Sequence, residues 1–162
     1  MTLVFNMTPK ALSPQFLIDC DILDFGCSGG TPKEAIAYVT IEKEEDYPYT
    51  GRAGTCKSEG SKEILPRSKH VHTYMIGGRR LKYELATKSP FVAMVDASSR
   101  SFRNYKSGVY YNPDCENEFK KLNHGVQVIG YGTDPKEGDY WLLVSRQATR
   151  ALALSSALLF PL

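Results

Sequence analysis

The spacing of apolar residues changes near residue 90, and this change limits the fold more than any other feature of the sequence. Before it, apolar residues recur at helical intervals. After it, they form short β-branched or aromatic runs bounded by Gly, Asn, Asp or Pro. Helices followed by strands are typical of an α+β fold and not of a parallel sheet with alternating helices. We therefore predict an α+β chain in which the strands come last.

Individual elements follow from local signals. Ser13 and Pro14 suit the cap and first turn of a helix, and Thr31 and Pro32 begin a second helix in the same way. Leu81 and Leu85 mark a third helix that ends near Pro90. Residues 42–66 are polar and rich in Gly, Pro and Tyr, which predicts long loops. Strands are predicted at residues 91–95, 108–111, 125–131 and 140–144.

Composition excludes several classes of function. Apolar residues make up 42% of the 162 residues and the net charge is only +2, with no basic run interleaved with aromatic residues. A nucleic-acid partner is therefore not expected. No apolar stretch is long enough to span a membrane, and residues 1–8 lack the features of a signal peptide. The apolar tail, residues 148–162, is expected to be either a buried strand or a frayed end.

The chain has four cysteines: Cys20, Cys27, Cys56 and Cys115. An even number permits two disulfides in any of three connectivities, and disulfides are typical of an oxidising compartment. A metal site is the alternative, but no C-x-x-C pair is present and the spacing of Cys20 and Cys27 is not typical of zinc ligands. We therefore do not expect a metal site.

One histidine is a candidate for chemistry. His124 precedes a run of alternating apolar residues, which would place it at the mouth of a strand. Its imidazole could act as a general base if a nucleophile lies within hydrogen-bond reach. For a single histidine, a structural role with satisfied hydrogen bonds is the commoner alternative. His70 and His72 lie in a polar segment and are expected to be solvated.

Gly29 and Gly30 are a second candidate. Adjacent glycines can present backbone N–H and C=O groups to an extended peptide, as in recognition by strand addition. The alternative is a simple turn.

Taken together in order, these segments resemble the papain-like cysteine peptidases, and most closely the branch of cathepsins L, K and S. The resemblance covers residues 12–141. It is carried by Leu12-Ser13-Pro14-Gln15, Ile18-Asp19-Cys20, Gly26-Cys27-Ser28-Gly29-Gly30, Tyr47-Pro48-Tyr49 with Cys56, Val95-Asp96-Ala97, Ser101-Phe102, Gly108-Val109-Tyr110-Tyr111 with Cys115, Leu122-Asn123-His124-Gly125-Val126, Val128-Ile129-Gly130-Tyr131-Gly132 and Tyr140-Trp141-Leu142.

The resemblance implies a two-lobed papain-like α+β fold, with a helical portion at residues 1–66, a β-rich lobe at 67–147 and a divergent tail at 148–162. It also implies a cysteine endopeptidase that works through a thiolate–imidazolium pair and an acyl-enzyme, without a cofactor. His124 would be the base. Gly29 and Gly30 would pair with the substrate backbone, and the Asn123 carbonyl would accept a substrate N–H. The pocket for the side chain two residues before the scissile bond would be lined by Thr31, Pro32, Met94, Leu122 and Gly125.

The family pairing corresponds to a disulfide between Cys20 and Cys56. It leaves Cys27 and Cys115 without the partners that the family supplies. The four cysteines all fall on structural positions of the family, and its nucleophile would lie before Met1. Ser145 stands by count where the family has the asparagine that orients the histidine, and we expect its short hydroxyl to be a poor replacement.

We therefore expect an incomplete peptidase, truncated at both ends, with a depleted helical lobe and no turnover of its own. The expected partners are peptide or protein substrates and cystatin-type inhibitors, and the expected location is lysosomal or extracellular. A catalytically dead homologue that binds peptides or inhibitors is the alternative. An unrelated structural or metal-binding module is the third hypothesis.

Overall fold

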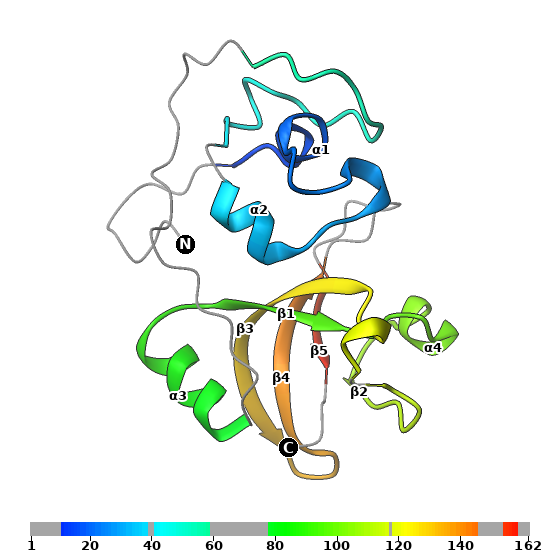
Figure 1. Ribbon diagram of the computed structural model, residues 1–162. Coiled ribbons are helices and arrows are strands. Elements are labelled where there is room, and N and C mark those ends of the chain that lie inside the picture. Colours follow the sequence, from blue (N-terminus) through cyan, green and yellow to red (C-terminus); the bar gives the residue numbers. More distant parts are fainter. Residues whose placement is uncertain (1–10, 39–40, 59–77, 117, 146–153, 159–162) are drawn as a thin grey trace. The chain divides into compact units, whose positions relative to one another are not determined.

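A computed structural model describes residues 11–38, 41–58, 78–116, 118–145 and 154–158 (Figure 1). The chain divides into two compact units, residues 2–74 and residues 75–162. The first unit is helical and the second contains the sheet, so the predicted order of helices before strands is confirmed. The predicted boundaries at 66–67 and 147–148, together with His70 and His72, lie outside the described residues.

The first unit is built on helix α1 (Pro14–Cys20). The Ser13 side chain accepts a hydrogen bond from the Phe16 amide at 2.9 Å and donates to the Tyr47 carbonyl at 2.5 Å. The helix thus begins at the predicted cap, and the same hydroxyl ties it to a loop. Phe16, Cys20 and Tyr47 form a small buried cluster, in which the rings of Phe16 and Tyr47 meet edge to face at 5.6 Å.

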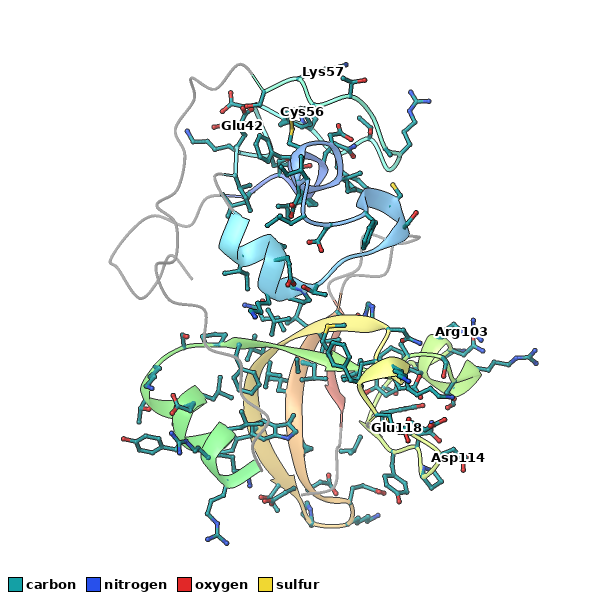
Figure 2. The ribbon with its side chains drawn as sticks, viewed as in Figure 1. Glu42, Cys56, Lys57, Arg103, Asp114 and Glu118 are labelled. Carbon is teal, nitrogen blue, oxygen red and sulfur yellow. A yellow bond between two sulfur atoms is a disulfide. The ribbon has the colours of Figure 1, made fainter. Side chains whose placement is uncertain are left out.

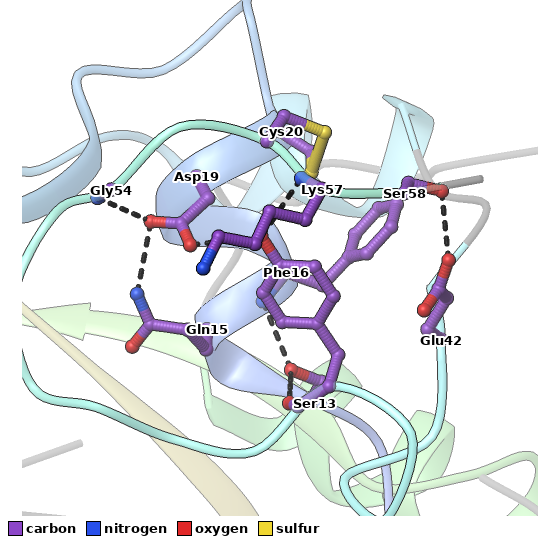
Figure 3. The surroundings of a disulfide bond; sticks show 11 residues. Ser13, Gln15, Phe16, Asp19, Cys20, Glu42, Gly54, Lys57 and Ser58 are labelled. Carbon is purple, nitrogen blue, oxygen red and sulfur yellow. Dashed lines mark hydrogen bonds between the residues drawn. A yellow bond between two sulfur atoms is a disulfide. The ribbon is translucent and has the colours of Figure 1, made fainter. Parts of the chain in front are cut away.

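A disulfide joins Cys20 at the end of α1 to Cys56 in the following loop, and Figure 3 shows the polar contacts around it. This is the pairing that the resemblance implies. Beside it, Asp19 accepts hydrogen bonds from the Gly54 amide (2.7 Å), the Gln15 side chain (2.9 Å) and the Tyr47 hydroxyl (2.9 Å). Burial alone would raise the pKa of Asp19, but these hydrogen bonds outweigh it and hold that pKa below its ordinary value.

The rest of the first unit consists of the short 3₁₀ helix η2 (Gly26–Ser28), helix α2 (Pro32–Tyr38) and loops. Helix α2 begins at Pro32, as predicted. Residues 42–58 contain no helix or extended strand, in agreement with the predicted loops. Leu12 and Lys43 form an isolated antiparallel bridge that connects the segment before α1 to this loop region.

The second unit is a five-stranded sheet in the order β1-β3-β4-β5-β2. Its strands are β1 (Phe91–Val95), β2 (Val109–Tyr110), β3 (His124–Asp134), β4 (Gly138–Ser145) and β5 (Leu154–Leu158). Neighbouring strands are antiparallel except β2 and β5, which run parallel. Strands β1 to β4 were predicted. Of the two alternatives for the tail, a strand or a frayed end, residues 154–158 form a strand, β5.

Helices α3 (Gly78–Thr87) and α4 (Arg100–Arg103) and the 3₁₀ helix η3 (Phe119–Lys121) complete the second unit. The core is formed by side chains from the sheet and α4, namely Val95, Phe102, Val126, Val128, Trp141 and Leu143, with Leu81 and Leu85 of α3 packed against it. Strands β3 and β4 form a hairpin. At its turn the Asp134 carboxylate accepts from the amides of Lys136 and Glu137, and Gly138 takes a φ of 83°.

The β2 edge of this sheet is short and has charged surroundings. Strand β2 has two residues, and the exposed side chains of Arg103, Asp114 and Glu118 lie on the same side of the unit as α4 and β2 (Figure 2). Short edges and nearby charges discourage pairing with another chain. None of the helices in the described ranges is long and apolar enough to cross a membrane.

Candidate active site

His124 is the first residue of β3, where the strand lies beside the end of β1. It pairs with Val95. The residue before it, Asn123, is held by hydrogen bonds of its backbone amide and of its side chain. The Asn123 amide donates to the Val95 carbonyl at 3.0 Å, and the Asn123 side-chain oxygen accepts from the Ala97 amide at 2.8 Å. These bonds fix the backbone immediately before His124, so the strand presents its histidine in one orientation.

The imidazole has two close neighbours. Its Nε2 lies 2.8 Å from the Ser145 Oγ, and its ring meets the Phe102 ring edge to face at a centroid distance of 6.0 Å. Ser145 is the last residue of β4 and follows the Val144–Gln127 pair, so the antiparallel β3–β4 ladder brings it close to the start of β3. Burial lowers the pKa of His124 below its ordinary value of 6.5, which favours the neutral imidazole.

The Ser145 hydroxyl reaches the ring from the position where, by count, the family has its orienting asparagine. The reason is the pairing of β3 with β4, which places the two backbones at ladder distance. The expectation that a hydroxyl is a poor replacement for the carboxamide stays a prediction. Phe102 was missed as a partner of His124, because a buried aromatic residue in a short helix carries no sequence signal for the ring that it contacts.

Two of the predicted pocket residues lie next to His124 in the same ladder. Met94 pairs with Gly125, one step along from the Val95–His124 pair. Because cross-strand pairs alternate between the two faces of a sheet, Met94 points to the face opposite Val95 and His124. Leu122 is partly exposed just before Asn123, and its amide donates to the Phe119 carbonyl at 3.3 Å.

The other predicted site residues lie in the first unit. Gly29 has a φ of 111°, and its own amide and carbonyl are both used: the amide donates to Gly26 and the carbonyl accepts from Phe25. Gly30 is exposed, and within the described residues its amide and carbonyl make no hydrogen bond. A Cβ at Gly30 would lie 2.3 Å from the Asp24 side chain, so only glycine fits there.

Asp24 and the start of α2 hold this turn in place. The Asp24 carboxylate accepts from the Thr31 amide at 2.8 Å, and the Thr31 hydroxyl accepts from the Glu34 amide at 3.4 Å. Pro32 follows as the first residue of α2 and is partly exposed. The predicted site residues therefore form two local groups, with Gly29 to Pro32 in the first unit and Met94, Leu122, Asn123, His124 and Gly125 in the second.

The cysteines differ in their surroundings. Cys20 and Cys56 are joined, whereas Cys27 is an exposed free thiol and Cys115 a partly exposed one. Burial raises the pKa of the Cys115 thiol and the nearby Asp96 carboxylate raises it further, which is the opposite of what activates a cysteine. Within the described ranges no three His, Cys, Asp or Glu side chains are placed to hold a metal ion.

The papain family cysteine protease profile matches residues 3–146. The chain belongs to this family. A cathepsin L-like protein of Caenorhabditis elegans is 39% identical over 139 residues, and cathepsin S of Bos taurus is 38% identical over 141 residues. Each alignment covers 82% of this chain but 41% of the relative, so the chain spans less than half the length of these two proteins.

Solved structures agree with the family. The digestive procathepsin L2 proteinase from the larval midgut of Tenebrio molitor matches with a TM-score of 0.75 at 30% identity, covering 93% of this chain and 48% of that one. A Carica candamarcensis cysteine protease matches with a TM-score of 0.69 at 29% identity, covering 85% and 62%. The fold of this chain is accordingly papain-like α+β, as the sequence predicted.

Proposed function

We propose that these 162 residues supply the general base and part of the substrate-binding surface of a papain-type cysteine endopeptidase, and that they do not hydrolyse peptides by themselves. The observation that carries the proposal is the geometry of His124. Its ring is held by Ser145 and Phe102, its low pKa favours the neutral form, and its Nδ1 makes no hydrogen bond in the described part of the chain. A neutral imidazole with a free nitrogen can accept the proton of a thiol.

The surroundings of the four cysteines are the reason for proposing that this chain does not hydrolyse peptides by itself. Two of the four are consumed in a disulfide, and the pKa of Cys115 is raised. Cys27 stands at a position that the family uses for a disulfide. Nucleophilic cysteines need a lowered pKa beside a histidine or another cation. The acyl-enzyme route therefore requires a thiol from outside these residues.

Substrate would be bound through its backbone and one side chain. We assign the backbone contacts to Gly30 rather than equally to both glycines, because the amide and carbonyl of Gly29 are already used inside the turn. The Asn123 carbonyl would accept a substrate N–H, since the amide and side chain of Asn123 are anchored elsewhere. Thr31, Pro32, Met94, Leu122 and Gly125 would line the pocket for the side chain two residues before the scissile bond.

The proposed substrates are peptides and proteins, and cystatin-type inhibitors are proposed to bind the same surface. The disulfide and the cathepsin relatives favour a lysosomal or extracellular location.

A second candidate function is peptide or inhibitor binding without catalysis. The exposed backbone of Gly30, which makes no hydrogen bond to the described residues, favours it. Titration calorimetry of the 162-residue chain with an extended peptide and with a cystatin would measure it. Binding of the extended peptide by the chain would support this function, and no binding of either ligand would contradict it.

The proposed base is tested by restoring a thiol. The 162 residues would replace the aligned region of the C. elegans relative, which is 39% identical, to give a chimera that keeps the rest of that protein. We expect thiol-dependent hydrolysis of a fluorogenic peptide by the chimera, a loss of at least about 10³-fold in kcat in His124→Ala, and no hydrolysis by the 162 residues alone. Full activity in the His124→Ala chimera, or turnover by the isolated chain, would contradict the proposal.

A further inference from the structure

In the hydrogen bond between His124 and Ser145, either side chain can be the donor. Ser145 Oγ lies 2.8 Å from Nε2, and in the described part of the chain each of these two side chains has the other as its one hydrogen-bond partner. A serine hydroxyl can donate one hydrogen bond and accept others, and a neutral imidazole has one nitrogen of each kind. The bond is therefore satisfied with the proton on either ring nitrogen.

The ring plane is fixed by other contacts. Phe102 is only 7% exposed and meets the imidazole at an interplanar angle of 72°. Phe102 is supported in turn by Tyr110, whose ring lies 5.6 Å away at 87°, and Tyr110 by Tyr105 at 5.9 Å. This row of edge-to-face contacts, together with the Ser145 hydrogen bond, restrains rotation of the His124 ring. The position of each ring nitrogen is thus set, while the position of the proton is not.

We propose that Ser145 is a positioning residue that fixes the orientation of His124 but leaves its neutral tautomer open. When Ser145 accepts from Nε2–H, the lone pair of Nδ1 is free and the imidazole can act as a base there. When Ser145 donates to Nε2, the proton sits on Nδ1 and that nitrogen cannot accept one. The catalytically competent fraction of the enzyme is then the fraction in the first state, and the apparent rate falls in proportion.

The expected effect on rate rests on the proposed role of His124 as base. The tautomer equilibrium does not rest on it, because that equilibrium is a property of the chain itself. It can be measured without activity. The ¹⁵N shifts of imidazole nitrogens distinguish the protonated from the unprotonated ring nitrogen. The test is a ¹⁵N spectrum of the histidine rings in the 162-residue chain, recorded above pH 7, with His124 assigned by comparison with His124→Gln.

Three substitutions separate the explanations. Ser145→Asp offers a carboxylate that can only accept, Ser145→Thr keeps the hydroxyl, and Ser145→Ala removes it. We expect intermediate shifts at both nitrogens in the wild type and in the Thr variant, which indicate exchanging tautomers. We expect an Nε2–H spectrum in the Asp variant and shifts in the Ala variant that differ from those of the wild type.

A wild-type spectrum that already shows Nε2–H alone, as in the Asp variant, would overturn the inference, because the hydroxyl would then only accept. Identical wild-type and Ala spectra, or a His124 signal that coincides with the histidine signal of the urea-unfolded chain, would also overturn it. The wild-type spectrum decides the matter even if a Ser145 variant does not fold. Failure of the proposed function would be seen separately, as full activity of the His124→Ala chimera.

Discussion

The buried hydroxyl of Ser13 makes two hydrogen bonds at the start of α1. It is 1% exposed, caps α1 through the Phe16 amide and donates to the Tyr47 carbonyl, 34 residues away in sequence. Removing the hydroxyl therefore leaves an uncapped helix and an unpaired carbonyl together.

We predict that Ser13→Ala lowers the free energy of unfolding by about 2–3 kcal/mol, measured by urea denaturation. Ser99→Ala is the matched control, because Ser99 also caps a helix by accepting from Ser101 but is partly exposed and bonds no buried carbonyl. We expect the control to lose about 0.5–1 kcal/mol. Equal losses in the two variants would show that the Tyr47 contact contributes nothing.

The lowered pKa of His124 makes the stability of the folded chain depend on pH. The unfolded chain takes up the proton at the ordinary pKa of 6.5, whereas the folded chain takes it up only at lower pH, so between these values the unfolded state binds more protons. The stability of the wild type relative to His124→Gln should therefore rise with pH up to about 6.5 and stay constant above it.

Urea denaturation of both proteins across that pH range makes the measurement, and taking the difference cancels the titration of all other groups. A difference that falls as pH rises would mean that folding raises the pKa of His124, contrary to its burial in this structure.

Several residues behave as their local sequence indicates. The helix cap at Ser13, the proline at the start of α2 and the disulfide between Cys20 and Cys56 could be anticipated, the first two from backbone chemistry and the third from the resemblance. The Ser145–His124 contact could not be, because 21 residues separate them and only the β3–β4 register brings them together. The use of the Gly29 amide and carbonyl inside the turn also could not be predicted without the turn geometry.

At the scale of elements, β3 and β4 determine both the core and the site. Val126 and Val128 of β3 and Leu143 and Trp141 of β4 are buried in one cluster, while the ends of the same strands carry His124 and Ser145. The register is not uniform, since a shift occurs between Val128 and Gly130. Alternation in the sequence predicted the strands, but it could not predict this shift or helix α4, whose four residues are too few to show a period.

Loss of core packing in β4 should destabilise the second unit. Leu143 is 2% exposed, so Leu143→Ala should lower the free energy of unfolding by about 2–5 kcal/mol. Val92→Ala in β1 is the control, because Val92 is 45% exposed, and it should cost less than about 1 kcal/mol. Urea denaturation followed by the fluorescence of Trp141, the single tryptophan, reports on this unit directly. Similar losses in both variants would contradict the assignment of Leu143 to the core.

At the scale of the whole molecule, the candidate site residues fall into two groups, each described within its own unit. The glycine turn that would bind a peptide backbone lies in residues 2–74, and the histidine with its supporting residues lies in residues 75–162. The family and the fold class could be predicted from the sequence because ordered landmarks run through both units. The environments of the free cysteines could not, since the raised pKa of Cys115 depends on burial and on Asp96.

The central claim is that His124 is the partner of a nucleophilic thiol, and the thiol itself can report on it. In the chimera described above, the rate of alkylation by iodoacetamide would be measured against pH for the wild type and for His124→Ala. We predict that the wild-type nucleophile is alkylated rapidly well below pH 7, because a thiolate–imidazolium pair lowers the thiol pKa, and that His124→Ala shifts the profile up toward an ordinary thiol pKa near 8.5. Superimposable profiles would contradict the claim.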